Sequence, residues 1–316
     1  MLKEMGILRG VNLGGWLSQC DYSAARLNEF ILAEDFSRIA SWGLDHVRIP
    51  VDYNVLEDDN GGYDAPGWER IDFALAECAK NHLKVVLDLH KTAGFSFDAN
   101  HMETGFFDSE ACQERFYRLW EQIARRYGRL SDSVVFELLN EVTSEAFIGT
   151  WNRIAREAIR RIRVYAPNTL ILVGSYHNNS APAVKALDAP ADDHVIYNFH
   201  CYDPLHYTHQ GAHWVDAFDI NDRVAWKDSG AVESFFEQHF ASAIEAAEKN
   251  HTTLYCGEYG VIDVVPTEDA IHWFRAINAV FERHGIARAV WSYRQMDFGI
   301  SDERWDSMRD ELLKVL

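Results

Sequence analysis

The sequence predicts a single α/β domain over residues 1–316, folded as a (β/α)8 TIM barrel. Three observations carry this prediction. Eight short, apolar, β-prone segments alternate with longer amphipathic segments, which is the pattern of parallel strands joined by helices. No linker, low-complexity stretch or change of composition divides the chain. The early glycines Gly10, Gly14 and Gly15 do not form GxGxxG, so a doubly wound dinucleotide-binding sheet is the weaker alternative.

The expected strands are short and mostly apolar, as strands buried on both faces of a parallel sheet are. The fourth is the clearest, because VVFELLNE is apolar until it ends in Asn140 and Glu141. Burying an unpaired amide and carboxylate is costly, so their place at a strand end indicates a site, with the opening of a polar loop as the alternative. The eight strands are expected at residues 7–16, 46–51, 84–90, 134–141, 169–174, 195–202, 254–261 and 287–293.

Helical periodicity occupies the intervals between these strands. A first helix is expected from about Arg26 to the residue before Gly43, and a second begins near Trp68. A long amphipathic helix begins near residue 110 and ends at Gly128. Further helices are expected around residues 151–162 and 232–249, after Thr267 as a cap, and at the C-terminus.

The composition fits a globular protein with a large core, since 47% of the residues are hydrophobic and 13% are aromatic. A formal net charge of -19 argues against nucleic acid or an anionic membrane as partner and suits a neutral ligand. The start of the sequence lacks a signal-peptide pattern, so both a cytoplasmic protein and a processed secreted protein fit. No run approaches the roughly 20 apolar residues of a membrane span. We expect the protein to be a monomer. The scattered cysteines form no CxxC and are expected to be reduced: Cys20, Cys78, Cys112, Cys201 and Cys256.

Polar side chains gather where the expected strands end. The carboxyl ends of barrel strands meet at one rim, which is where barrel enzymes build their active sites. Each residue alone is compatible with packing, and Arg48 in particular has Glu137 as a possible ion-pair partner, but their convergence on one rim indicates a site. In chain order they are Arg48, His90, Asn140 with Glu141, His200 with Tyr202, Glu258, and Trp291.

Two carboxylates that face one pocket meet the requirement for glycoside hydrolysis, a reaction that needs no cofactor or metal. One carboxyl group must donate a proton, and the other must be ionised, so their surroundings must differ. Arg48 is expected to hold Glu258 in its charged form. We therefore assign Glu258 as the nucleophile and Glu141 as the acid/base.

Short motifs in the same order make the chain resemble glycoside hydrolase family 5. They are GVNLGGW, HVRIP, LDLH, ELLNE, NFHCYDP, YCGEYGV and VWSY, and they extend over about residues 7–300. The resemblance implies a retaining barrel hydrolase with catalytic glutamates at the ends of strands four and seven, here Glu141 and Glu258. It implies substrate contacts for Arg48, His90 and Asn140, and likewise for the following residues: His200, Tyr202 and Trp291. It also implies a cis peptide bond between Trp291 and Ser292.

The segment HYTHQGAHW (residues 206–214) and the phrase LYCGEYGV resemble compact clostridial endo-β-1,4-glucanases of this family. Two features depart from that pattern. HKTAG at residues 90–94 replaces the more usual HxAPG, and the region after strand six is short for these enzymes.

The interval from about residue 203 to 230 has no obvious element of its own, and loops of this length are usually functional. Its aromatic residues include Tyr207, Trp214, Phe218 and Trp226. We expect this loop to form one wall of an open cleft, with Tyr207 and Trp214 packing on sugar rings. The alternative is that these aromatic side chains only anchor the loop to the barrel.

The leading functional hypothesis is a retaining endo-β-1,4-glucanase that acts on β-linked glucan. Three other activities of the same family remain possible: β-mannanase, mixed-linkage glucanase and β-1,3-glucanase. A few loop contacts decide which sugar epimer and which linkage the enzyme accepts. A non-catalytic glycan-binding barrel is the alternative from another class. A phosphate-handling barrel is disfavoured, because the loop after strand seven, GVIDVVPTED, is acidic and would repel phosphate.

Overall fold

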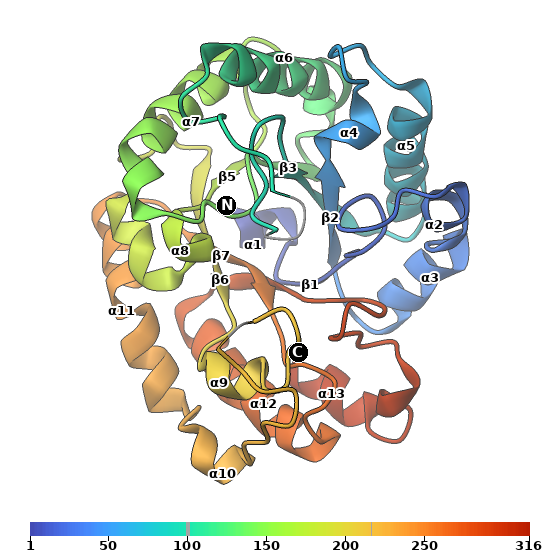
Figure 1. Ribbon diagram of the computed structural model, residues 1–316, viewed down its shortest axis with the longest axis vertical. Helices are drawn as coiled ribbons and strands as arrows, with labels where there is room; N and C mark the ends of the chain where they lie inside the picture. The colour runs from blue at the N-terminus through green and yellow to red at the C-terminus, as the bar shows by residue number, and fades with distance from the viewer. Residues whose placement is uncertain (99–101, 216) are drawn as a thin grey trace.

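The computed structural model describes residues 1–98, 102–215 and 217–316. Eight parallel strands close into a barrel in the order β1 to β8, with β1 paired to β8, and helices surround them (Figure 1). This arrangement confirms the predicted (β/α)8 TIM barrel. The strands are β1 Arg9–Asn12, β2 His46–Asp52, β3 Lys84–Lys91, β4 Val134–Glu137, β5 Ile171–Val173, β6 Val195–Cys201, β7 Leu254–Tyr259 and β8 Ala287–Val290.

The longer helices follow the strands and pack their apolar faces on the outside of the barrel. In the described ranges, none of them has the length and apolarity that crossing a bilayer requires. The α-helices are α1 Leu2–Met5, α2 Ala24–Glu29, α3 Ala33–Ser41, α4 Tyr53–Leu56, α5 Ala65–Lys80, α6 Glu110–Tyr127, α7 Ile148–Ile162, α8 Tyr176–Asn179, α9 Leu205–Thr208, α10 Trp226–Ser229, α11 Glu233–Lys249, α12 Thr267–His284 and α13 Arg309–Val315. The 3-10 helices are η2 Gly128–Leu130, η3 Glu145–Phe147, η4 Ala181–Ala186 and η5 Glu303–Trp305.

The interior of the barrel changes from apolar to polar along the strands. Near the strand N-termini, Leu2 of α1 packs into a buried apolar cluster that includes Val86, Val135 and Ile196. Side chains alternate with a period of two along a strand, so the residues two positions further along also face inward. These residues are polar and fully buried: Asp88, Glu137 and Asn198. The sequence therefore builds a polar layer inside the barrel on top of an apolar one.

The predicted helix from Arg26 to the residue before Gly43 is wrong in one respect, because it is divided into α2 and α3. The carboxylate of Asp35 accepts a hydrogen bond from the backbone N–H of Leu32 at 2.9 Å and so begins α3. The same carboxylate accepts a hydrogen bond from the hydroxyl of Tyr293 at 2.6 Å. This contact with a residue distant in sequence fixes the division between α2 and α3. The periodicity of apolar residues along the chain does not indicate such a contact.

The fourth strand is shorter than the predicted residues 134–141, because its ladder ends at Glu137. The backbone N–H groups of Leu138 and Asn140 still donate to carbonyls of the neighbouring segments at 3.2 Å each. The chain therefore stays between its neighbours, and Asn140 and Glu141 lie just beyond the ladder at the mouth of the barrel.

Candidate active site

Arg48 on β2 is the centre of the polar layer below the barrel mouth. Its Nε and Nη2 each donate to one carboxylate oxygen of Glu137 at 2.7 Å. Nη1 donates to Oε1 of Glu258 and Nη2 to Oδ1 of Asn140, both at 2.8 Å. A guanidinium group holds its acceptors in fixed directions. The ion pair with Glu137 thus fixes Arg48, and Arg48 in turn fixes the residues at two strand ends.

Glu258 reaches the mouth because the ladder between β7 and β8 is irregular between Cys256 and Tyr259. Tyr255 faces the interior, so regular alternation would turn residue 258 outward, and the irregularity re-aims it. Oε2 of Glu258 accepts a hydrogen bond from the hydroxyl of Tyr202 at 2.8 Å. Burial and the nearby carboxylate raise the pKa of Tyr202 well above its usual value, so the phenol remains a donor. The two oxygens of Glu258 are thus each held by one donor, the guanidinium group of Arg48 and the phenol of Tyr202.

Glu141 lies in a different environment, in which both of its contacts are neutral. Its Oε2 accepts a hydrogen bond from Nδ2 of Asn178 at 2.8 Å, and its Oε1 lies 2.8 Å from Nδ1 of His200. Burial raises the pKa of Glu141 to about 7, against the lowering effects of the Asn178 hydrogen bond and of more distant positive charge. Burial also lowers the pKa of His200 to about 4, so its imidazole is neutral at pH 7. Glu141 is therefore able to carry a proton near neutral pH.

The two glutamates face each other across His200. One carboxylate oxygen from each glutamate and a ring nitrogen of His200 all lie within 4.8 Å of one another. Nδ1 of His200 is 3.8 Å from Oε2 of Glu258. The limit of 4.8 Å between one oxygen of each glutamate is well short of the roughly 6.5 to 9.5 Å separation of inverting glycosidases and suits the closer carboxyl groups of retaining ones. By distance alone, the three side chains are also able to share a metal ion.

His90 and Trp291 form a pair of parallel rings beside the glutamates. Their ring centroids are 5.9 Å apart and their planes differ by 3°. Nδ1 of His90 lies 2.6 Å from Oδ2 of Asp88, and Nε2 lies 3.1 Å from Oε1 of Gln19. The peptide bond between Trp291 and Ser292 is cis, which confirms that prediction. Burial lowers the pKa of His90 to about 4, so two neutral rings border the site.

The loop after β6 differs from the expectation, because it contains the short helices α9 and α10. Tyr207 has no exposed surface and packs edge-on against Trp226, with ring centroids 5.9 Å apart. A side chain in that position anchors the loop and does not fit the sugar contact that we expected of it. Trp214 is 38% exposed and packs against His209, whose ring in turn contacts Tyr202. A chain of ring contacts therefore connects Trp214 to Tyr202, which bonds the nucleophile candidate Glu258.

Some residues of the site were not selected from the sequence. Asp88 stands two positions before His90 on the same strand. The alternation that turns His90 into the barrel therefore also predicts that Asp88 faces the interior. Asn178 has a positive φ of 51° within the short α8, and nothing in the local sequence indicates that it reaches Glu141.

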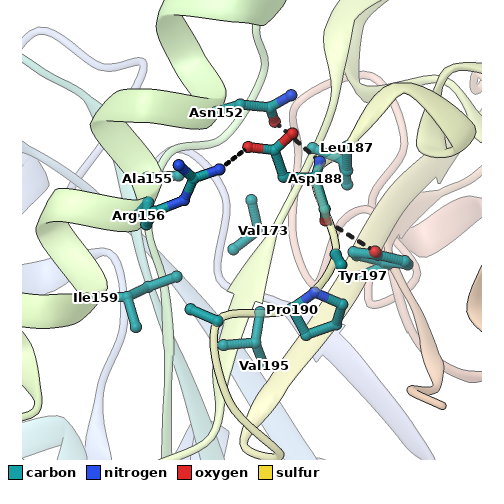
Figure 2. Close-up of a pocket in the computed structure, with 12 residues that line it drawn as sticks. Asn152, Ala155, Arg156, Ile159, Val173, Leu187, Asp188, Pro190, Val195 and Tyr197 are labelled. Atoms are coloured by element: carbon teal, nitrogen blue, oxygen red, sulfur yellow. Dashed lines mark hydrogen bonds and ion pairs between the residues drawn. The ribbon is translucent and has the colours of Figure 1, made fainter. Parts of the chain in front are cut away.

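A hollow away from the barrel mouth lies between α7 and the segment before β6 (Figure 2). Its polar groups pair with one another. Arg156 and Asp188 form an ion pair, the hydroxyl of Tyr197 donates to the carbonyl of Asp188 at 2.9 Å, and Oδ1 of Asn152 accepts from the N–H of Asp188 at 3.3 Å. Among the side chains drawn in Figure 2, these pairings leave little to recognise a ligand, so we assign no function to this hollow.

Comparisons with known proteins identify the family. The family model described as Cellulase (glycosyl hydrolase family 5) matches residues 9–297. Cellodextrinase A of Ruminococcus flavefaciens is 57% identical, over 91% of this chain and 86% of that protein. Endoglucanase C of Acetivibrio thermocellus is 35% identical over 97% of each chain. The solved structure of the clostridial cellulose synthase subunit Z from Clostridioides difficile has a TM-score of 0.85 and 26% identity, over 98% of this chain and 99% of that one.

The family model spans the barrel from β1 to the segment after β8 and includes both glutamates at the mouth. With nearly the whole chain matched and two relatives above 30% identity, the chain belongs to glycosyl hydrolase family 5 and is a glycoside hydrolase.

Proposed function

We propose that this enzyme is a retaining endo-β-1,4-glucanase that cleaves β-glucan chains by double displacement, with Glu258 as the nucleophile and Glu141 as the acid/base. The observation that carries the proposal is the short distance between two carboxyl groups in unlike surroundings. The names of the two relatives, a cellodextrinase and an endoglucanase, support β-1,4-glucan as the substrate.

In the first step, Glu258 attacks the anomeric carbon of the sugar at the centre of the site. Its charge is held by Arg48 and Tyr202, each 2.8 Å away. Glu141 gives its proton to the glycosidic oxygen as the bond to the leaving sugar breaks. A pKa of about 7 suits this role, because the carboxyl group is still protonated near neutral pH.

In the second step, water replaces the leaving sugar. Glu141, now ionised, takes a proton from this water as the oxygen attacks the anomeric carbon and releases Glu258. Asn178 and His200 hold the two oxygens of Glu141 in place during both steps. Two inversions at the same carbon give net retention.

The remaining residues at the mouth supply contacts to the sugar. Asn140 is buried and keeps its Nδ2 without a hydrogen-bond partner in the described part of the chain, so that group is free to donate to a sugar hydroxyl. The ring of Trp291, just after β8, offers an apolar face, and the 38% exposed ring of Trp214 in the loop after β6 offers another. We further propose that residues 1–316 form one catalytic domain and act as a monomer, because one chain supplies every residue named here.

Azide rescue tests the two roles, with dinitrophenyl β-cellobioside as a substrate that needs little protonation. The Glu141→Gln variant should still be glycosylated, hydrolyse the intermediate slowly, and regain turnover with azide to give the β-glycosyl azide. The Glu258→Gln variant should give at most the α-azide. The reverse pairing of azide and variant would show that the two roles are exchanged.

A panel of polymers tests the substrate. Reducing sugar should be released from soluble β-1,4-glucan faster than from β-mannan or β-1,3-glucan. Faster release from mannan would replace the proposed substrate, and no release from any polymer by a correctly folded enzyme would favour a glycan-binding barrel.

A further inference from the structure

A cluster outside the active site brings together three metal-binding residue types. Cys201 ends β6, Asp203 follows it closely in the chain, and His239 projects from α11. One donor atom from each, a sulfur, a carboxylate oxygen and a ring nitrogen, lies within 4.8 Å of the others. Cys201 is fully buried, while the side chains of Asp203 and His239 are 40% and 17% exposed, so the cluster has one side open to solvent. Sulfur, nitrogen and oxygen together form a donor set that zinc accepts.

The contact between His239 and Asp203 is not a hydrogen bond. Nε2 of His239 lies 3.1 Å from Oδ2 of Asp203, yet this buried nitrogen makes no hydrogen bond in the part of the chain that the structure describes. Nε2 of His239 is therefore a buried nitrogen beside a carboxylate oxygen with its hydrogen-bonding capacity unused. A separation of this order suits two ligands of one tetrahedral zinc ion, because each lies about 2.0 to 2.2 Å from the ion.

Neighbouring side chains fix the positions of these two groups. The ring of Phe235 stacks on His239, with centroids 5.5 Å apart and planes 14° from parallel. Nε1 of Trp273 donates to the backbone carbonyl of Asp203 at 3.0 Å. Supporting contacts of this kind hold ligands in the orientation that a metal requires.

We propose that Cys201, Asp203 and His239 bind one zinc-like divalent cation, with water from the open side as the fourth ligand. On binding, the sulfur–metal bond forms as the thiol proton leaves to solvent. A thiol must lose its proton to bind a metal, so each ion bound should release one proton.

This site would act on the active site only through the backbone. Tyr202 lies between two of the ligands in sequence, and its hydroxyl donates to Oε2 of Glu258 at 2.8 Å. A metal that joins the end of β6 to α11 would hold the chain on both sides of Tyr202. Zinc should therefore raise the melting temperature of the enzyme, and this stabilisation should disappear in a His239→Gln variant.

Titration of the metal-free enzyme with Co²⁺ at pH 8 tests the proposal. Thiolate bound to cobalt gives a charge-transfer band in the near ultraviolet, so the band reports sulfur ligation directly. The Glu141, His200 and Glu258 side chains contain no sulfur, so cobalt in the active site gives no such band. One equivalent of Co²⁺ should produce the band, and one equivalent of Zn²⁺ should remove it.

Three variants complete the test, each checked for its fold by circular dichroism. Cys201→Ala should lose the band, and His239→Gln should bind Co²⁺ at least tenfold more weakly. Cys256→Ala, which changes a buried cysteine on neighbouring β7 outside the cluster, should keep both the band and the affinity. The proposal is wrong if the wild type gives no band, if the band survives in Cys201→Ala, or if His239→Gln binds as tightly as the wild type. His239→Gln alone decides the question if Cys201→Ala does not fold.

Discussion

The free energy of unfolding of a Glu141→Gln variant, relative to that of the wild type, should rise with pH. Burial raises the pKa of Glu141 from its ordinary 4.5 to about 7. Below pH 4.5 this carboxyl group is protonated in both the folded and the unfolded chain, so it contributes nothing to pH dependence. Between pH 4.5 and 7 only the unfolded chain loses the proton, so the free energy of unfolding falls as pH rises.

The size of the effect follows from the difference between the two pKa values. About 2.5 pH units at about 1.4 kcal/mol each give a total loss of about 3.5 kcal/mol, most of which falls between pH 4.5 and 8. The neutral amide of Glu141→Gln removes this loss. The free energy of unfolding of the variant minus that of the wild type should thus rise by about 3 kcal/mol between pH 4.5 and 8. Changed hydrogen bonds to His200 and Asn178 add an offset, which does not alter the slope.

Reversible urea unfolding at several pH values measures this difference. Glu145→Gln is the matched control for the loss of one glutamate charge, because Glu145 is exposed and close to Glu141 in sequence. The other buried carboxylates are common to both proteins and cancel. A difference between the Glu141 variant and the wild type that stays constant from pH 4.5 to 8 would refute the idea that burial of this carboxyl group is what raises its pKa.

Three further predictions concern activity. Asn178→Ala removes a hydrogen bond that lowers the pKa of Glu141. The basic limb of the pH profile of kcat/KM, expected near pH 7 in the wild type, should therefore move to higher pH. An unchanged limb would exclude Glu141 as the group that produces it. Gly257→Ala places a Cβ 2.9 Å from Nε2 of His200, so kcat should fall while circular dichroism stays native, and full activity would show that His200 is free to move aside. Tyr202→Phe removes one donor to the nucleophile and should lower kcat/KM by roughly tenfold to a hundredfold in steady-state assays, whereas a loss below twofold would contradict that contact.

The order of elements and the gathering of polar residues at one rim were predictable because both depend on local pattern. Short apolar runs, each ending in a polar residue, specify strands whose carboxyl ends meet in a parallel barrel. The inward position of Asp88 below His90 follows from the same two-residue alternation. His200 could be placed at the mouth for the same reason, whereas Arg48, predicted at the same rim, lies within β2 and belongs to the polar layer below the mouth.

What could not be predicted depends on contacts between distant segments. The irregularity in β7 turns Glu258 inward against the alternation of its own strand. Asn178 reaches Glu141 from a short turn with left-handed backbone, and its neighbours in sequence do not indicate that direction. Tyr207 is buried and packs against Trp226 of the same loop. The sequence does not distinguish an aromatic residue buried in this way from one exposed to substrate.

Trapping of the glycosyl-enzyme tests the central claim most directly. A 2-deoxy-2-fluoro cellobioside with a dinitrophenyl leaving group slows both steps, but the leaving group keeps the first one fast enough for the intermediate to accumulate. Mass spectrometry of the proteolysed enzyme should find one fluorocellobiosyl group on the peptide that contains Glu258, and none on Glu258→Gln. A label on Glu141, or turnover with inversion and no covalent intermediate, would contradict the account.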